Sequence, residues 1–173
     1  CVIIEFKGMR PDVSRASFIA ENATISGDVI LGEESSVWFS AAIRGEVESI
    51  RIGNKSNVQD NATLHSDYDC PIIIGDRVSV GHNAIVHGAI IEDDVIVGMH
   101  ATVMDGARVG RGSLIAAGAL VKEHEIIPER SLVVGVPGRV VRTLDEQAYE
   151  RNLANAKVYV EDAKEYAKSP VIG

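Results

Sequence analysis

Residues 74–121 read IGDRVS VGHNAI VHGAI IEDDVI VGMHAT VMDGAR VGRGSL IAAGAL V, so that an aliphatic residue opens each unit at a spacing of six. The phase extends back to Ile19, and the unit at Val86 is one residue short. The fifth place is usually Ala, Ser or Val, so large first residues can fill an interior while small residues line its corners. Stacked units bury a core that one unit could not bury alone. The period therefore predicts a repeat architecture, because a β-sandwich has no reason to keep a six-residue phase.

Length and composition limit the class of protein. The chain has 173 residues, 46% of them hydrophobic, which predicts one domain over residues 1–173. A formal net charge of -8 argues against nucleic acid and anionic membranes as partners. No apolar run approaches the ~20 residues of a membrane-spanning helix, and residues 1–14 lack the basic-then-apolar pattern of a signal peptide. We therefore expect a soluble, cytoplasmic protein that does not need a disulfide between Cys1 and Cys70.

The units resemble the hexapeptide repeat of left-handed parallel β-helices, in which three units form one triangular coil. This resemblance covers residues 19 to about 121 and implies an all-β fold. The left hand comes from the resemblance alone, because parallel crossovers are normally right-handed. We expect coils over residues 19–126 and a connecting segment over residues 127–142. Gly-Val-Pro-Gly at residues 135–138 is typical of a turn that leaves the coil.

Residues 143–168 carry the pattern of an α-helix. Thr143 and Glu146 match a capping box at its start, and Ser169-Pro170 is expected to end it. Apolar residues recur at three- and four-residue steps, which predicts one apolar stripe packed on the coil. The stripe consists of Tyr149, Leu153, Ala156, Val160, Ala163 and Ala167.

Successive units fall in turn on the three faces of a prism, which we name A, B and C. The two interruptions of the repeat, residues 46–51 and 67–73, then both lie at the corner between faces A and B. We expect them to stack as neighbouring loops. Face A takes the units at Ile25, Ile43, Leu64, Val86, Val103 and Val121, face B those at Leu31, Ile52, Ile74, Ile91 and Val109, and face C those at Ile19, Val37, Val58, Val80, Val97 and Ile115.

Two histidines take the same place on face A. His65 and His87 are each the second residue of a unit, one coil apart, so they point outward about 4.8 Å from each other. Arg44 takes that place one coil earlier, whereas His82 takes the third place of a face C unit. Two imidazoles at this spacing can bind one divalent metal at about 2.0 to 2.1 Å, but His82 lies around a corner from them.

A second copy of the chain is expected to supply the third histidine. If face A of one chain meets face C of the next, the repeated contact closes a three-fold ring with one metal at each interface. We therefore expect a homotrimer that shares its metal between subunits. Asp60 lies one coil from His82 and would then face Arg44 of the neighbouring subunit as an ion pair.

The strings IRGE at 43–46, VQDNATLH at 58–65 and VGHNAIVHG at 80–88 resemble the gamma-class carbonic anhydrases. The resemblance implies a lyase that interconverts carbon dioxide and bicarbonate through metal-bound hydroxide, since a metal on three neutral imidazoles lowers the pKa of bound water to about 7. Zn²⁺ is the default metal for these ligands, with Fe²⁺ and Co²⁺ as alternatives. The resemblance assigns His65, His82 and His87 as metal ligands, Arg44 and Asp60 as the interface ion pair, Gln59 as an active-site amide and Tyr159 as a residue near the bicarbonate site.

The proton acceptor is where the sequence departs from the family pattern. Glu46 and Val47 stand where the best-known enzyme has an acidic pair, and the loop of residues 66–71 is short. We expect Glu46 to hold the preceding arginine and treat it as a candidate catalytic residue. Asp67 or Asp69 could relay protons through water.

Three other functions use the same repeat or the same site. Hexapeptide-repeat acyltransferases share the coil and use one interface histidine, but they do not require Arg44, Gln59 and three histidines together. Some relatives of this kind are linked to metal-dependent thioester hydrolysis, so a thioesterase is an alternative. The third is a non-catalytic metal-binding or assembly module in which the metal pins the trimer. Metal analysis and a carbon dioxide hydration assay separate these functions.

Overall fold

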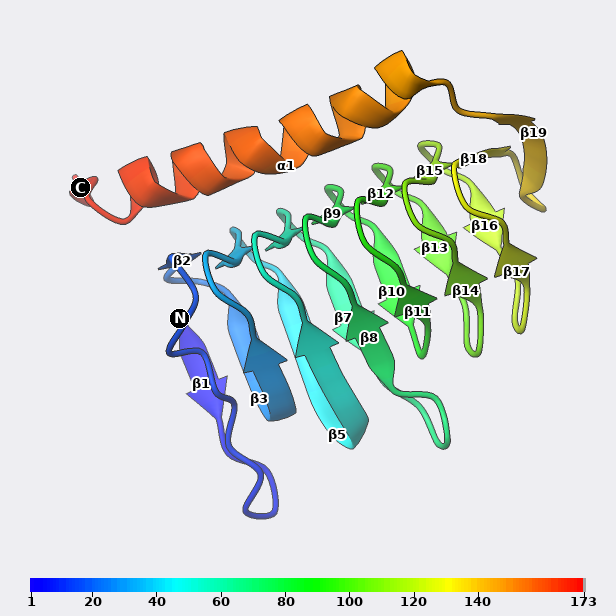
Figure 1. Cartoon of the computed structure of the whole chain (residues 1–173). Helices are drawn as coiled ribbons and strands as arrows, with labels where there is room; N and C mark the ends of the chain where they lie inside the picture. Colours follow the sequence, from blue (N-terminus) through cyan, green and yellow to red (C-terminus); the bar gives the residue numbers. More distant parts are fainter. Residues whose placement is uncertain (173) are drawn as a thin grey trace.

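The computed structural model describes residues 1–172 of the chain. It is a stack of coils built from short parallel strands, with one α-helix along its side, which confirms the predicted parallel β-helix with a C-terminal helix (Figure 1). Within the described residues, no helix has the length and apolar character of a membrane-spanning segment. The elements are β1 (Val2–Ile4), β2 (Phe18–Ile19), β3 (Thr24–Leu31), β4 (Ser36–Val37), β5 (Ala42–Ile52), β6 (Asn57–Val58), β7 (Thr63–His65), β8 (Ile72–Ile74), β9 (Ser79–Val80), β10 (Ile85–His87), β11 (Ile90–Ile91), β12 (Ile96–Val97), β13 (Thr102–Val103), β14 (Arg108–Val109), β15 (Leu114–Ile115), β16 (Leu120–Val121), β17 (Ile126–Ile127), β18 (Ser131–Val134), β19 (Arg139–Thr143) and α1 (Glu146–Tyr166).

Strand pairing follows the predicted faces. Face A consists of β1, β7, β10, β13, β16 and the first parts of β3 and β5. Face B consists of β8, β11, β14, β17 and the remainders of β3 and β5. Faces A and B form one sheet because β3 and β5 continue around the corner, whereas face C is a separate sheet that runs from β2 to β19. The register Ile43 to Leu64 to Val86 on face A confirms the assignment of units to faces, and so does the register Val58 to Val80 on face C.

The corner between faces C and A repeats one backbone turn. In each copy of this turn, one residue adopts the left-handed backbone conformation. These residues are Asn61, Asn83 and His100, with φ between 57 and 59°. Asn adopts this conformation more readily than most residues because its short side chain can bond locally. The residue that follows is a fully buried alanine, as at Ala62 and Ala84, which keeps the corner narrow. His100 is thus an exposed corner residue.

The first predicted interruption is part of a strand instead of a free loop. Residues 46–51 lie within β5, and a register shift opposite Gly27 and Val29 absorbs the extra residues. The second interruption turns back on itself between Asp67 and Cys70, and β8 has already resumed at Ile72. As expected, the two segments are neighbours, because the Ser66 hydroxyl donates to the Glu48 carbonyl at 2.7 Å.

The coil extends further than the expected end at residue 126. β18 stacks in parallel on β15, so Ser131–Val134 still belongs to face C, and only β19 turns back antiparallel. The predicted capping box is wrong. Thr143 belongs to β19, and the N-cap is Asp145, whose carboxylate accepts from the Ala148 amide at 2.8 Å. The backbone of Thr143 pairs with Ser131 and is therefore not free to open a helix.

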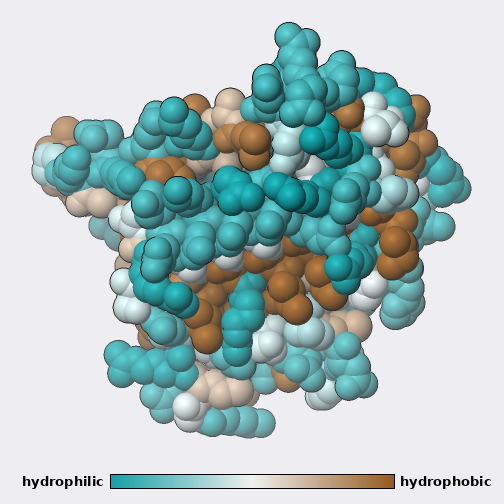
Figure 2. All heavy atoms as spheres, in the orientation of Figure 1, coloured by the Kyte–Doolittle hydropathy of each residue, from teal (hydrophilic) through white to brown (hydrophobic). Residues whose placement is uncertain are grey.

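One side of α1 packs on the coil, as predicted, although two of the stripe residues are less buried than the stripe predicts. Leu153 is only half-buried and Ala167 lies exposed beyond the helix. Asn152 is buried instead, because its amide donates to the carbonyl oxygens of Asp94 and Gly112 at 3.3 and 3.2 Å. Hydrophilic side chains cover the outer side of the helix, and hydrophobic residues gather over the coil below it (Figure 2).

Candidate metal centre

His65 and His87 end the neighbouring strands β7 and β10 of face A. The register pairs them directly and places Arg44 beside His65, as the spacing predicts. The His65 Nδ1 and His87 Nε2 atoms lie 2.9 Å apart, and the ring centroids are 4.9 Å apart. Both side chains are largely sheltered, with 19% and 27% of their surface exposed. One nitrogen of each ring therefore points at the other ring.

The outer nitrogen of each ring faces a carboxylate. His65 Nε2 lies 3.1 Å from Glu46 Oε1, and His87 Nδ1 lies 2.6 Å from Asp105 Oδ1. A carboxylate only accepts hydrogen bonds, so each outer nitrogen carries the N–H and donates it. This hydrogen-bond pattern assigns the tautomers of both rings.

The assigned tautomers leave two acceptors face to face. A neutral imidazole has one donor nitrogen and one acceptor nitrogen, so His65 Nδ1 and His87 Nε2 both present lone pairs across 2.9 Å. Two lone pairs at this distance repel unless a cation, either a proton or a metal ion, lies between them. Imidazole nitrogens are also the ligands that Zn²⁺ and related metals prefer. The residues present therefore fit a divalent metal.

His82 lies apart from this pair, at the corner between faces C and A. Its Nδ1 lies 2.8 Å from Asp60 Oδ2, so it too donates its N–H to a carboxylate and keeps Nε2 as an acceptor. Its side chain is 40% exposed. Within residues 1–172 of one chain, His82 makes no hydrogen bond to His65 or His87. In a single chain, the third predicted ligand is thus not part of the pair that His65 and His87 form.

Tyr159 and Gln59 lie beside His82. The Tyr159 hydroxyl is 3.5 Å from His82 Nε2, and its ring packs edge-on against Trp38 with centroids 5.3 Å apart. Burial, and then the nearby carboxylates of Asp60 and Asp162, raises the pKa of Tyr159. The Gln59 amide is buried and donates to Asn57 Oδ1 at 3.0 Å, which fixes its orientation. A cavity of about 420 Å³ is lined by Gln59, His82, Asn155 and Tyr159 together with apolar residues of face C.

The two members of the predicted ion pair have other partners within the chain. Arg44 pairs with Glu46, as expected for that carboxylate, and Asp60 pairs with His82. A pair between Arg44 and Asp60 of different subunits stays a prediction. Among the described residues, the second carboxylate oxygen of Glu46, Oε2, is buried without a hydrogen-bond partner. It is therefore an acceptor still available to a ligand at this site.

Asp105 is the site residue that sequence reasoning missed. Asp67, His87 and Asp105 each offer one ligand atom within 4.8 Å of the others. Asp105 takes the third place of the face A unit that follows the His87 unit, so stacking of the units was the available signal. Asp67 also accepts the Tyr68 amide at 2.8 Å within its own turn, and the structure brings Asp69 to no described metal-ligand group.

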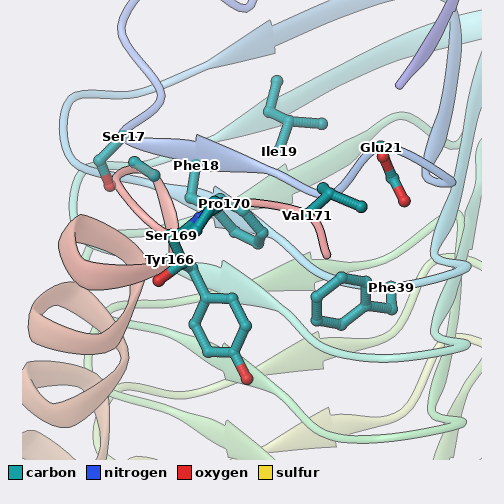
Figure 3. A pocket seen from close by; sticks show the side chains of 10 residues that line it. Ser17, Phe18, Ile19, Glu21, Phe39, Tyr166, Ser169, Pro170 and Val171 are labelled. Atoms are coloured by element: carbon teal, nitrogen blue, oxygen red, sulfur yellow. The ribbon is translucent and has the colours of Figure 1, made fainter. Parts of the chain in front are cut away.

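A second hollow lies at the opposite end of α1 from the helix start. Its volume is about 420 Å³, and Phe18, Phe39 and Tyr166 line it together with Pro170 and Val171 (Figure 3). Among the described residues, Glu21 is the one charged side chain in its lining. Most of its lining is apolar, so the histidine array, which consists of His65, His82 and His87 with their carboxylates, is the better candidate site.

Comparison with known proteins finds hexapeptide-repeat transferases and carbonic anhydrases. Residues 88–123 match the family model "Bacterial transferase hexapeptide (six repeats)", and residues 71–103 match "Hexapeptide repeat of succinyl-transferase". The chain is 41% identical to a carbonic anhydrase of Geobacillus kaustophilus, covering 95% of this chain and 91% of the relative. It is 38% identical to the mitochondrial gamma carbonic anhydrase 2 of Arabidopsis thaliana, covering 91% of this chain and 59% of the relative. A solved structure of a hexapeptide transferase family protein from Anaplasma phagocytophilum superposes with a TM-score of 0.91 at 34% identity, covering 95% of this chain and 98% of that one.

Proposed function

The chain belongs to the gamma-class carbonic anhydrase family, and on that premise we propose that it interconverts carbon dioxide and bicarbonate at a divalent metal shared between subunits. One observation carries the proposal. Two imidazole nitrogens face each other across 2.9 Å while a carboxylate holds the opposite nitrogen of each ring. Because both outer nitrogens donate to carboxylates, the two inner nitrogens both present lone pairs, and this arrangement suits a cation that both nitrogens bind.

His65 Nδ1 and His87 Nε2 of one chain would hold the metal together with His82 Nε2 of a neighbouring copy. Along the chain, the unit of His82 lies after that of His65 and before that of His87. The height of His82 along the β-helix axis therefore lies between the heights of the other two histidines. Copies related by a three-fold axis parallel to the coil lie at equal levels, and the contact needs no shift along the axis. This agreement supports a closed homotrimer over an open filament.

Held by these three neutral imidazoles, a divalent metal would supply the Lewis-acid chemistry that activates water near pH 7 for the hydration of carbon dioxide. Glu46 orients His65 through Oε1, and its free Oε2 accepts a hydrogen bond or a proton from water at the site. Arg44 neutralises Glu46 and lies at the outer edge. From the other side of the interface, Gln59 presents a fixed amide and Tyr159 a hydroxyl toward the substrate. Both groups orient bicarbonate by hydrogen bonds.

The metal we propose is Zn²⁺, with Fe²⁺ and Co²⁺ as the alternatives, because imidazole binds all three. Stopped-flow hydration of carbon dioxide with Zn²⁺-, Co²⁺- and anaerobically Fe²⁺-loaded protein tests the activity. We expect turnover with at least one metal and none with the His82→Ala variant. Stable metal binding without hydration under any loading would favour a metal-pinned assembly module instead.

A transferase is the second candidate, because the fold is shared with a hexapeptide transferase family protein. The same preparations should therefore be incubated with acetyl-CoA and a set of amine and hydroxyl acceptors. Release of free thiol that depends on the acceptor would indicate acyl transfer, whereas metal-dependent release without an acceptor would indicate a thioesterase. We expect neither.

A further inference from the structure

We propose that Asp105 is a positioning residue for the metal centre: its carboxylate holds the Nδ1–H of His87 and so reserves Nε2 for the metal. The inference rests on the proposed function. His87 Nδ1 lies 2.6 Å from Asp105 Oδ1, which is the shortest of the three histidine–carboxylate contacts. Charge-assisted hydrogen bonds of this length are strong. Both side chains are sheltered, with 27% and 22% of their surface exposed, so water competes weakly for the bond.

The backbone is built to bring this carboxylate to the ring. Asp105 follows β13, which stacks on β10, and the Gly106 amide donates to the Gly88 carbonyl at 2.7 Å. Gly88 has a φ of +57°, and a Cβ placed on it would lie 2.4 Å from Asp105 Oδ1. A side chain at residue 88 would therefore push the carboxylate away. The residue directly after His87 leaves open the space that Asp105 occupies.

Asp105 differs from the other two carboxylates in its role. Glu46 is shared between His65 and Arg44, and Asp60 lies at the surface expected to meet a neighbour. Among the described residues, the Asp105 side chain has His87 as its only hydrogen-bond partner. Without Asp105, no hydrogen bond found among the described residues would hold the Nδ1–H of His87, so its tautomer and the tilt of its ring would be less constrained. The metal would then compete with a proton on Nε2 in part of the molecules.

The same residues could be read as a separate metal site of Asp67, His87 and Asp105. The two readings exclude each other at one atom, since Nδ1 of His87 cannot both donate a proton to Asp105 and donate a lone pair to a metal. The 2.6 Å separation favours the hydrogen bond, because a nitrogen and an oxygen bound to one metal at about 2.0 to 2.2 Å normally stand farther apart. Asp67 therefore serves as the matched control.

The experiment compares assembled wild-type protein with Asp105→Asn, Asp105→Ala and Asp67→Asn. The Zn²⁺ dissociation constant is measured by competition with a chromophoric chelator, and the tautomer of His87 is measured by ¹H–¹⁵N NMR on metal-free protein. Asp105→Asn is nearly isosteric and should fold, and unfolding in denaturant checks this. We expect both Asp105 variants to bind Zn²⁺ about 10 to 100 times more weakly and to lose the Nδ1–H tautomer, while Asp67→Asn keeps wild-type values.

An Asp105 variant with unchanged affinity and unchanged tautomer would overturn the inference, and so would an equal loss in Asp67→Asn, which would indicate direct binding by the acidic cluster. The NMR measurement keeps the inference separate from the proposed function. Wild-type protein that binds no metal, or a His82→Ala variant that binds it fully, would contradict the shared centre. The tautomer of metal-free His87 would still report on Asp105.

Discussion

Two carboxylate networks lie on the same β-helix. They differ in whether the residues of one chain supply all the hydrogen-bond partners. Asp94 is fully buried at the corner under the start of α1. Its Oδ1 accepts from Arg77 Nε at 2.6 Å, and its Oδ2 accepts from the Tyr149 hydroxyl at 2.6 Å and from Arg111 Nε at 2.8 Å. Both carboxylate oxygens of Asp94 therefore accept hydrogen bonds within the chain. This network ties the helix to the coil.

The histidine array is the opposite case. Each histidine has its carboxylate, but His65 and His87 present two facing acceptors, and Glu46 Oε2 is buried without a partner among the described residues. The side chain of His82 is partly exposed and, within the described part of the chain, is not hydrogen-bonded to His65 or His87. A closed network stabilises the fold, whereas the open one supports the proposed metal and the proposed contact with a neighbouring subunit.

Removal of a ligand from the open network should have the largest effect. We expect His87→Ala to lower the metal content from about one ion per chain to almost none, because a single remaining imidazole on face A holds a metal weakly. The free energy of unfolding of metal-free protein should change by less than about 1 kcal/mol. Metal analysis after gel filtration and denaturant unfolding measure the two quantities. The exposed corner variant His100→Ala should keep its metal, and retention by His87→Ala would contradict the account.

The closed network should respond in the reverse way. We expect Asp94→Asn to lower the free energy of unfolding by about 3 kcal/mol, since it removes the buried charge that two arginines and a tyrosine share. Metal content should remain that of the wild type. Tyr149→Phe removes one hydrogen bond and should cost about 1 kcal/mol. Equal stability of Asp94→Asn and wild type would show that the network does not anchor the helix.

The closed network also predicts a pH dependence. Burial is the largest influence on the pKa of Asp94 and raises it, but hydrogen bonds from Arg77, Tyr149 and Arg111 outweigh burial and hold this pKa below its ordinary value of 3.8. A lowered folded-state pKa stabilises the protein above pH 3.8 and loses that contribution as the pH falls below it. The stability difference between metal-free wild type and Asp94→Asn should therefore shrink from about pH 6 to about pH 3. A stability difference that grows on acidification would contradict a lowered pKa of Asp94 in the folded protein.

The smallest effect on activity and stability is expected at Tyr159, which belongs to the same helix α1 as Tyr149 of the closed network. Tyr159→Phe keeps the ring against Trp38, so stability should change by less than about 0.5 kcal/mol. It removes the hydroxyl 3.5 Å from His82 Nε2, and kcat/KM for hydration should fall by about fivefold, the equivalent of one modest hydrogen bond. Stopped-flow assays at equal metal content measure this change. An unaltered rate would assign Tyr159 to packing alone.

The repeat made the β-helix predictable because each unit contacts the units one coil before and after it. The six-residue period therefore predicts which residues pair between neighbouring coils. The registers of Ile43 with Leu64 and of His65 with His87 follow from it. The contact between Asp94 and Tyr149 spans 55 residues and depends on how the helix lies on the coil, which no repeat determines. The helix start at Asp145 was missed because pairing of Thr143 with Ser131 overrides a local capping signal.

The central claim is that one subunit offers His65 and His87 while its neighbour offers His82. Chains carrying His82→Ala and chains carrying His65→Ala should each bind almost no metal alone. After joint refolding in equal amounts, about one quarter of the sites should regain metal, because a site is complete only where an intact face A meets an intact corner. A mixture of His65→Ala with His87→Ala should regain none. Full metal binding by either variant alone, or none in the first mixture, would contradict the shared centre.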